Sequence, residues 1–477
     1  MYDVAIIGAG VVGGMIAREL SFYNIKVCLL EKENDVATGA TKANSAIVHA
    51  GFDAKEGSLK ALLNVKGSKM MSQVAKALNV KYINNGSLVV GFNEEDEKTL
   101  EGLLKRGNAN GVEGLKVLNR EEILEIEPNI GKSVTCALYA PTGAIICPYD
   151  LAVSAIGNAM DNGAELKCNF EVTDIENKGD FYTLKSKNEE IDAKYVVNCA
   201  GVYSDKVAKL AGDDAFDVHP RRGEYVLLDK ECGNIISHTV FVTPSKMGKG
   251  ILVSPTVDGN LLLGPTAVDG EDKTDKSTTP EFFSSIYDIA ERSVFGIPKN
   301  KTITSFCGLR SVGSTGDFII NTPKERFVNA AGIESPGLSA SPAIAEYVRT
   351  LLEGCGLDLK KKENPITTRR SMHAFREASK EEKNIMIKQN PAYGRIVCRC
   401  EGVTEGEILD AIRTNPKATD LDGVKRRTRA QMGRCQGGFC SPYIIELLSN
   451  ELGLPYEKIT KFGGESYVAI GKTKEIK

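Results

Sequence analysis

The chain has 477 residues, of which 42% are hydrophobic and 26% are charged. Its length exceeds what one hydrophobic core supports, and its composition is that of a soluble globular protein, which excludes disordered, collagen-like and membrane-dominated classes. Sixty basic and sixty-three acidic residues give a net charge of −3, which argues against a nucleic-acid partner. We therefore expect at least two folded units.

The sequence predicts a cytoplasmic protein without a transmembrane segment. The apolar stretch 4–17 is interrupted by four glycines and followed by Arg18, so it is too short and too broken to span a bilayer. The opening Met1-Tyr2-Asp3 lacks the positive charge that begins a signal peptide. We expect the twelve cysteines to be reduced thiols or metal ligands rather than disulfides.

The N-terminal segment predicts a dinucleotide site. A β-branched apolar run at 2–7 leads into Gly8-Ala-Gly10-Val-Val-Gly13, and we expect a helix over 11–22 and a second strand over 26–30 that ends at Glu31. In this strand–helix–strand pattern the glycines permit a tight turn, approach of the backbone to a pyrophosphate, and close packing of helix on strand. Glu31 is placed to accept hydrogen bonds from ribose hydroxyls.

A second glycine-rich stretch covers 329–344 and contains Gly332, Gly337 and Leu338. We expect it to open a helix that runs towards Arg349, whose N-terminus can face another part of the same cofactor. A plain loop before a helix is the alternative. No second complete glycine fingerprint follows a strand, so the sequence supports one dinucleotide.

Several motifs resemble the FAD-dependent D-amino-acid-oxidase superfamily. Gly39-Ala-Thr-Lys-Ala-Asn-Ser45-Ala-Ile-Val-His49-Ala-Gly51 is similar to its flavin-contacting segment, with supporting matches at 57–63, 198–205, 222–225, 264–266 and 308–310. Within the superfamily, the match is to the branch that holds anaerobic glycerol-3-phosphate dehydrogenase and L-2-hydroxyglutarate oxidase. The resemblance implies an FAD cofactor and further contacts to it from Thr41, Asn44, Ser45, Val172 and Gly201, together with Gly332, Gly337 and Leu338.

The last eighty residues carry a candidate metal site. Cys398 and Cys400 form one close pair, and Cys435 and Cys440 form another. Four thiolates can hold a [2Fe–2S] cluster or a structural zinc, and both centres carry a charge of −2, so charge does not separate them. The basic run 425–429 could offset that charge, or it could be a solvated helix face.

The segment from Tyr393 to about Leu452 resembles the bacterioferritin-associated ferredoxin-like [2Fe–2S] domain, a likeness that rests on all four cysteines and on helices opening near Thr404 and Pro442. The two resemblances imply an α/β fold with a Rossmann-like FAD-binding domain, an inserted α+β substrate domain and a small helical iron–sulfur domain. We expect the FAD-dependent module over 1–365, a helical linker over 366–392 and the iron–sulfur domain over 393–477.

Oxidation of an alcohol through a flavin needs a base for the hydroxyl proton and a cationic group for an anionic substrate. His49 is the candidate base or flavin-shaping residue, with a structural histidine as the alternative. Arg310 is the candidate anion-binding residue, because guanidinium matches carboxylate or phosphate and the equivalent arginine in relatives often binds substrate. Arg222 and Tyr225 are further candidates.

These features predict a dehydrogenase that oxidises a small anionic hydroxy compound and passes electrons through the cluster to a protein partner. Glycerol 3-phosphate is the first choice of substrate, with L-2-hydroxyglutarate or an amino acid as alternatives. A second hypothesis is a non-catalytic electron-transfer subunit of a larger complex. The partner is expected to be a second flavoprotein or a membrane-associated subunit, through which the protein would reach a membrane.

Overall fold

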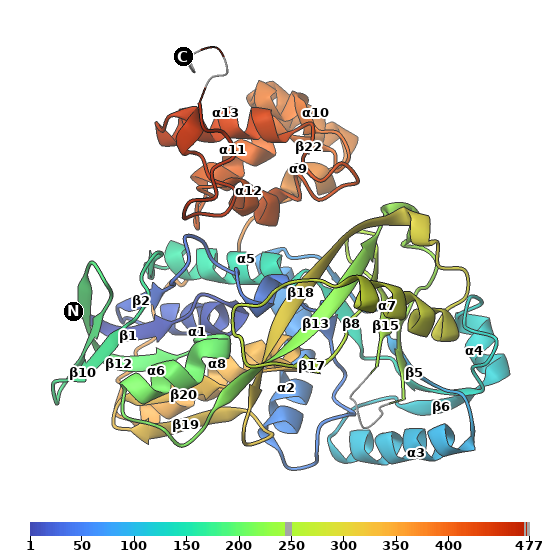
Figure 1. Ribbon diagram of the computed structural model, residues 1–477. Coiled ribbons are helices and arrows are strands. Elements are labelled where there is room, and N and C mark those ends of the chain that lie inside the picture. The colour runs from blue at the N-terminus through green and yellow to red at the C-terminus, as the bar shows by residue number, and fades with distance from the viewer. Residues whose placement is uncertain (244–249, 472–473, 475–477) are drawn as a thin grey trace.

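An eight-stranded sheet with a parallel centre forms one half of the main body (Figure 1). The computed structural model describes residues 1–243, 250–471 and 474. β1 (Tyr2–Ile7) lies between β2 (Val27–Leu30) and β12 (Glu190–Asn198) and pairs in parallel with both. The sheet is completed by β9 (Glu165–Lys167), β10 (Asp174–Asn177), β11 (Tyr182–Lys185), β19 (Ile319–Lys324) and β20 (Phe327–Ala331).

Helices cover this sheet because its strands are apolar on both faces. Val4 and Ile6 of β1 pack in one core and Ala5 and Ile7 in another, as expected for a strand buried in a parallel sheet. α1 packs against α5 and α8, and α8 against α2. The helices are α1 (Val11–Ser21), α2 (Leu59–Leu78), α5 (Pro148–Asp161), α6 (Ser204–Leu210) and α8 (Gly337–Gly354), with short η1 (Ala40–Lys42) and η2 (Gly201–Tyr203).

A nine-stranded, largely antiparallel sheet forms the other half. Its strands are β5 (Ser87–Gly91), β6 (Lys116–Asn119), β7 (Cys136–Ala140), β13 (Val218–Leu228), β14 (Thr239–Val242), β15 (Leu252–Pro255), β16 (Leu261–Gly264), β17 (Val268–Asp269) and β18 (Thr302–Gly313). Around it lie α3 (Glu94–Ala109), α4 (Arg120–Ile126), α7 (Pro280–Ser293), η3 (Lys230–Cys232) and η4 (Lys299–Lys301). A small sheet of β3 (Ile47–Val48), β4 (Tyr82–Ile83) and β8 (Ala144–Ile146) also belongs to the main body.

The C-terminal part forms a separate helical body above α5 in Figure 1. It holds β21 (Ile396–Cys398), β22 (Val403–Thr404), α11 (Glu405–Arg413), α12 (Leu421–Thr428) and α13 (Ser441–Leu452), with η5 (Pro391–Gly394) and η6 (Tyr456–Lys458). The Thr404 hydroxyl and the Glu407 carboxylate form a capping box that starts α11. Two helices, α9 (Ala374–Glu377) and α10 (Lys380–Gln389), lie in the segment that the sequence predicts as a helical linker. The predicted fold class is confirmed.

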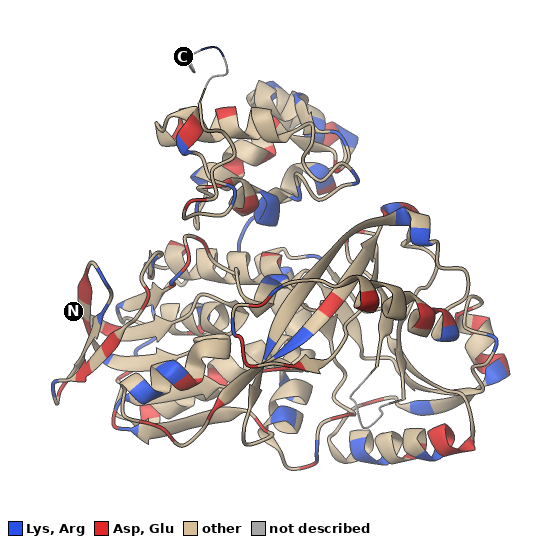
Figure 2. Cartoon of the chain, in the orientation of Figure 1, with Lys and Arg blue, Asp and Glu red and all other residues tan. Residues whose placement is uncertain are grey.

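The distribution of charge and the lengths of the apolar helices can both be followed in the described part of the chain. Figure 2 shows acidic and basic residues mixed over both bodies. No helix in the described part of the chain combines the length and the apolar character that crossing a bilayer requires.

Candidate functional site

A cavity of about 570 Å³ is lined by residues of both large sheets and by the turn after β1. The structure brings most of the predicted cofactor residues together around it: Gly8, Gly10, Glu31, Thr41, Asn44, Ser45, Val172, Gly201, Gly337 and Leu338. Gly13 and Gly332 do not line the cavity. A cavity lined by the glycine turn and by both sheets suits a dinucleotide.

The three glycines of the first turn have different roles. Gly8 has a φ of +107°, and a Cβ there would lie 2.4 Å from the carbonyl oxygen of Cys199. A Cβ on Gly13 would lie 2.0 Å from the carbonyl oxygen of Gly8, so Gly13 is required for helix packing. At Gly10 the nearest atom is the Thr41 hydroxyl at 3.2 Å. Gly10 is therefore the glycine that leaves room for a ligand beside the backbone.

Glu31 lies at the end of β2 with its carboxylate turned back towards the glycine turn. It accepts hydrogen bonds from the backbone N–H groups of Ala9 (2.9 Å) and Glu33 (3.0 Å). Burial raises the pKa of this carboxyl group. A carboxylate that is fixed by backbone donors and lines the cavity fits the ribose-binding role predicted from the sequence.

The loop that contains the predicted flavin-contacting motif is held by its own side chains. The Asn44 amide donates to the carbonyl of Thr41 (2.9 Å) and accepts from the N–H of Ala46 (2.8 Å), which has a φ of +59°. The Thr41 hydroxyl accepts from the N–H of Val11 (3.0 Å) and so caps the first turn of α1. Gly332, with a φ of +60°, instead lies against Gly313 of β18 and shapes the loop before α8.

His49 lines the cavity and lies next to the loop before α8. Its Nε2 is 3.4 Å from the Ser335 hydroxyl, and its backbone N–H donates to the hydroxyl of Ser339 (2.7 Å). Its ring packs against Phe241, with 5.8 Å between the ring centroids. The imidazole is therefore oriented by groups on two elements, as a proton-accepting side chain requires.

Tyr225 and Arg310 reach the same cavity from the paired strands β13 and β18. The Tyr225 hydroxyl is 3.2 Å from the Ser45 hydroxyl, and its ring stacks on Phe306. Burial raises the pKa of Tyr225, so the group is a neutral hydroxyl at pH 7. Arg310 donates to the backbone carbonyl of Thr266 (2.8 Å) rather than to a carboxylate, which leaves its charge for an anion.

Arg222 does not line the cavity. It is on the opposite face of β13 from Tyr225, because residues three apart in a strand point to opposite sides. Its guanidinium donates to the Ser277 carbonyl (2.7 Å) and pairs with Asp275 (3.0 Å). Of the two predicted anion-binding arginines, the structure places Arg310 alone at the cavity.

Residues that sequence reasoning did not nominate also belong to the site. Ser335 and Ser339 contact His49. Both lie in the stretch 329–344, which stands out in the sequence for its glycines and its expected helix N-terminus and not for its serines. Lysines enter the lining from a loop that carries no motif: Lys273 and Lys276. Lys273 is paired with Asp205 at 2.6 Å, so its charge is already compensated.

The four C-terminal cysteines form two pairs. The sulfur atoms of Cys400 and Cys435 are 3.6 Å apart. Cys440 lowers the pKa of Cys398 to about 6 by hydrogen bonding to its thiolate, and the same contact raises the pKa of Cys440. One partner in this second pair is thus poised as a thiolate, the form that binds iron or zinc.

This arrangement bears on the choice of metal centre. Among the described residues, no group of three or more His, Cys, Asp or Glu side chains is placed to hold a metal ion. Four thiols arranged as two close pairs suit a [2Fe–2S] cluster, in which each iron takes two thiolates.

Comparisons with known proteins agree with both sites. Residues 3–351 match the family described as FAD dependent oxidoreductase, and residues 396–450 match the BFD-like [2Fe-2S] binding domain. A glycerol 3-phosphate dehydrogenase of Caloramator mitchellensis is 49% identical over 476 residues, which are 99% of this chain and 99% of the relative. A glycerol 3-phosphate oxidase of Mycoplasma pneumoniae is 36% identical over 363 residues, covering 73% of this chain and 94% of the oxidase.

A solved structure shows the same fold with the cofactor in place. The dithionite-reduced L-alpha-glycerophosphate oxidase of Mycoplasma pneumoniae with FAD bound is 34% identical, with a TM-score of 0.73 over 77% of this chain and 98% of the oxidase. FAD and a [2Fe–2S] cluster are therefore the cofactors of this protein. The chain belongs to the FAD-dependent oxidoreductase family, and it carries a BFD-like [2Fe–2S] domain at its C-terminal end.

Proposed function

We propose that this protein is a dehydrogenase that oxidises glycerol 3-phosphate to dihydroxyacetone phosphate and passes the electrons through its [2Fe–2S] cluster to a protein acceptor. The observation that carries the proposal is the match to the Caloramator mitchellensis dehydrogenase, which extends over both bodies of the chain. The match to the Mycoplasma pneumoniae oxidase covers nearly all of that protein but 73% of this one. This chain therefore has a part that the oxidase lacks. We infer that the iron–sulfur domain in this part receives the electrons from the flavin and passes them to an acceptor.

The cavity supplies the groups that the reaction needs. The secondary alcohol loses a hydride from carbon and a proton from oxygen to become a ketone, and bound FAD supplies the hydride acceptor. We infer that His49 accepts the hydroxyl proton, with Ser335 beside its Nε2 and Ser339 holding its backbone N–H. Arg310 binds the phosphate dianion through its planar array of donors, for which it is free because it donates to a backbone carbonyl.

The electron acceptor belongs to the proposal as well. The hydride brings two electrons to the flavin, whereas a [2Fe–2S] cluster carries one, so the pair converts a two-electron oxidation into single-electron steps. We propose a protein acceptor, either a second flavoprotein or a membrane-associated subunit, that would also bring a cytoplasmic chain to the membrane. The corresponding domains are the module 1–365, the linker 366–392 and the iron–sulfur domain 393–477.

The test is reduction of the bound flavin without oxygen, followed by its visible absorbance. Glycerol 3-phosphate should bleach the flavin, while glycerol, L-2-hydroxyglutarate and proline should not. Arg310→Lys should slow bleaching at low substrate by about tenfold or more, because lysine lacks the bidentate donor pair whose loss costs roughly 1.5–3 kcal/mol.

Arg222→Lys is the matched control, because it makes the same change at an arginine of the neighbouring strand β13 that points to the other face of the sheet and pairs with Asp275. It should leave the rate unchanged. Equal rates for the Arg310→Lys variant and the unaltered protein would remove Arg310 from the site. Bleaching by L-2-hydroxyglutarate instead of glycerol 3-phosphate would replace the proposed substrate.

A further inference from the structure

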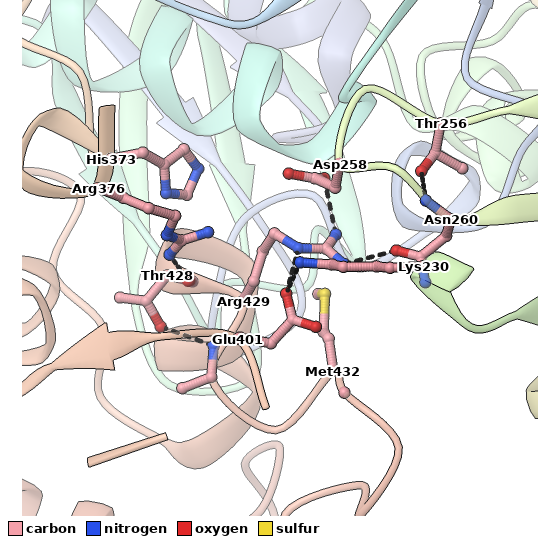
Figure 3. A network of polar contacts seen from close by, with 12 residues as sticks. Lys230, Thr256, Asp258, Asn260, His373, Arg376, Glu401, Thr428, Arg429 and Met432 are labelled. Carbon is pink, nitrogen blue, oxygen red and sulfur yellow. Dashed lines mark hydrogen bonds and ion pairs between the residues drawn. The ribbon is translucent and has the colours of Figure 1, made fainter. Parts of the chain in front are cut away.

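Two clusters of buried charged residues join the iron–sulfur domain to the FAD-binding body. The first cluster consists of Asp35, Arg426 and Arg427, and the second of Lys230, Asp258, Asn260, Glu401 and Arg429. Figure 3 shows the second cluster, where Arg429 reaches residues of both bodies. The basic run 425–429 is therefore neither a solvated helix face nor a charge reserved for the metal centre.

The first cluster holds the loop that follows the ribose-binding carboxylate. Arg427, which is 0% exposed, donates from its two terminal nitrogens to the two oxygens of Asp35 at 2.7 and 2.8 Å. Arg426 donates to the same carboxylate. Asp35 lies four residues after Glu31, and the backbone N–H of Ala37 donates to the carbonyl of Ala9 in the glycine turn (2.9 Å). Arginines of the iron–sulfur domain thus bind the loop that contains Asp35, next to the FAD site.

The second group of charged residues holds the segment that contains Cys400, one of the four cysteines predicted to bind the [2Fe–2S] cluster. Arg429, the C-cap residue that follows α12, donates to Glu401 (2.9 Å), which directly follows Cys400. The same guanidinium donates to Asp258 (2.7 Å) and Asn260 (3.1 Å) at the turn between β15 and β16. Lys230 of the FAD-binding body pairs with Glu401 at 2.9 Å. The Cys400 segment is therefore tied to the FAD-binding body from two directions.

These contacts disfavour movement of the iron–sulfur domain relative to the FAD-binding body. The second cluster balances its charges, with Arg429 and Lys230 against Asp258 and Glu401. In the first cluster two arginines share the carboxylate of Asp35. Separating the bodies would break both clusters and take these partners away from side chains that are buried, a change far more costly than breaking exposed ion pairs. Two clusters at different places also fix the rotation of one body on the other.

We propose that the two clusters lock the iron–sulfur domain in a single orientation on the FAD-binding body, with Arg429 as the positioning residue for electron transfer from flavin to iron–sulfur cluster. The inference rests on the proposed function and adds how electrons pass from the flavin to the iron–sulfur cluster. Each step oxidises the flavin by one electron and reduces the cluster by one, and the acceptor protein then takes that electron. Two such steps carry away the pair delivered by the substrate, without movement of the domain.

The experiment compares Arg429→Met and Asp258→Asn with Arg413→Met. Arg413 forms a bidentate but exposed pair with Glu451 inside the iron–sulfur domain, so its loss should not affect the contact between the bodies. Asp258→Asn removes the carboxylate of the FAD-binding body that pairs with Arg429. If Arg429→Met does not fold, this variant tests whether the contact fixes the position of the domain. Small-angle X-ray scattering and limited proteolysis within 366–392 report domain separation without any substrate.

Electron transfer is read separately, by photoreducing the flavin and following the cluster signal. Arg429→Met and Asp258→Asn should give a larger radius of gyration, faster cleavage and cluster reduction slower by about tenfold, the size of effect that residues coupled in one network show. The spectrum of the dithionite-reduced cluster should be unchanged. Scattering and transfer rates equal to those of Arg413→Met would overturn the lock. If glycerol 3-phosphate fails to reduce the flavin while these results hold, the lock stands and the proposed substrate falls.

Discussion

Substituting alanine at Gly10 and at Gly13 should separate the binding of FAD from the folding of its site. Both glycines belong to the same glycine motif, Gly10 just before α1 and Gly13 in its first turn, and alanine adds one methyl group at each. At Gly10 the φ of −80° suits any residue, and the new Cβ would meet the Thr41 hydroxyl at 3.2 Å. At Gly13 the new Cβ would lie 2.0 Å from the Gly8 carbonyl oxygen. The Gly8 backbone has little room to move away, because even a Cβ added to Gly8 would lie 2.4 Å from the carbonyl oxygen of Cys199.

The magnitudes follow from where the added methyl group is accommodated. An extra methyl in a packed site costs about 1–3 kcal/mol. At Gly10 this cost falls on the bound cofactor, so the dissociation constant of FAD should rise by roughly 5- to 150-fold. At Gly13 the same cost lowers the free energy of unfolding. It should lie at the upper end of the range, because the added methyl group meets a backbone carbonyl that cannot rotate away as a side chain could. About 3 kcal/mol is a large part of the total stability of a typical protein.

Two measurements on the cofactor-free protein check this pair of predictions. Denaturant unfolding should show Gly10→Ala close to the unaltered protein and Gly13→Ala strongly destabilised. Titration with FAD, followed by quenching of its fluorescence, should show weak binding by Gly10→Ala. A Gly10→Ala protein that binds FAD with unaltered affinity would refute the reasoning, as would one that loses as much stability as Gly13→Ala.

Two further predictions concern the C-terminal body. Cys435→Ser and Cys440→Ser should abolish the visible and paramagnetic signals of the cluster and slow turnover with the natural acceptor, yet leave flavin reduction by substrate nearly intact; finding one zinc and no iron in anaerobically prepared protein would contradict this. Although burial opposes it, Arg427 and Arg426 lower the pKa of Asp35 to about 2. Because the folded pKa lies below the unfolded value, the stabilisation of about 2 kcal/mol is present above pH 4 and lost between about pH 4 and 2, and Asp35→Asn should remove that part of the pH dependence of unfolding.

The sequence predicts the local elements of this fold well where one pattern decides them. The strand at 2–7 and the helix after it were expected within one residue, since β-branched residues, glycines and an apolar period all agree there. The capping box at Thr404 and Glu407 likewise marks the start of α11. These signals lie within a few residues of each other, which is why a single sequence contains them.

Arg222 shows where motif reading loses information. The stretch Arg222-Gly-Glu-Tyr225 reads as one motif, but it lies in the middle of the long strand β13. Alternation along a strand allows Arg222 and Glu224 on one face and Gly223 and Tyr225 on the other. Gly223 in turn leaves space for Arg310, because a Cβ there would lie 2.6 Å from Nη2 of that arginine. Recognising the strand would have separated the two candidates.

The contacts of the basic run were beyond prediction for a different reason. Arg427 and Asp35 are 392 residues apart in the chain, and nothing local indicates which carboxylate a buried arginine will meet. From the sequence, the run 425–429 could offset the charge of the metal centre or form a solvated helix face, whereas in the structure Asp35, Asp258 and Glu401 pair with its arginines. Little of its positive charge is left for the cluster.

Backbone donors must therefore supply much of the stabilisation that the thiolates need. Although burial opposes it, the N–H groups of Gly437 and Phe439 lower the pKa of Cys435. Those of Gln431 and Glu401 act in the same direction on Cys398. Hydrogen bonds to cluster sulfurs raise the reduction potential, because they stabilise the more negative, reduced state. The potential of the cluster is therefore set by the backbone of two short loops rather than by mobile side-chain charges.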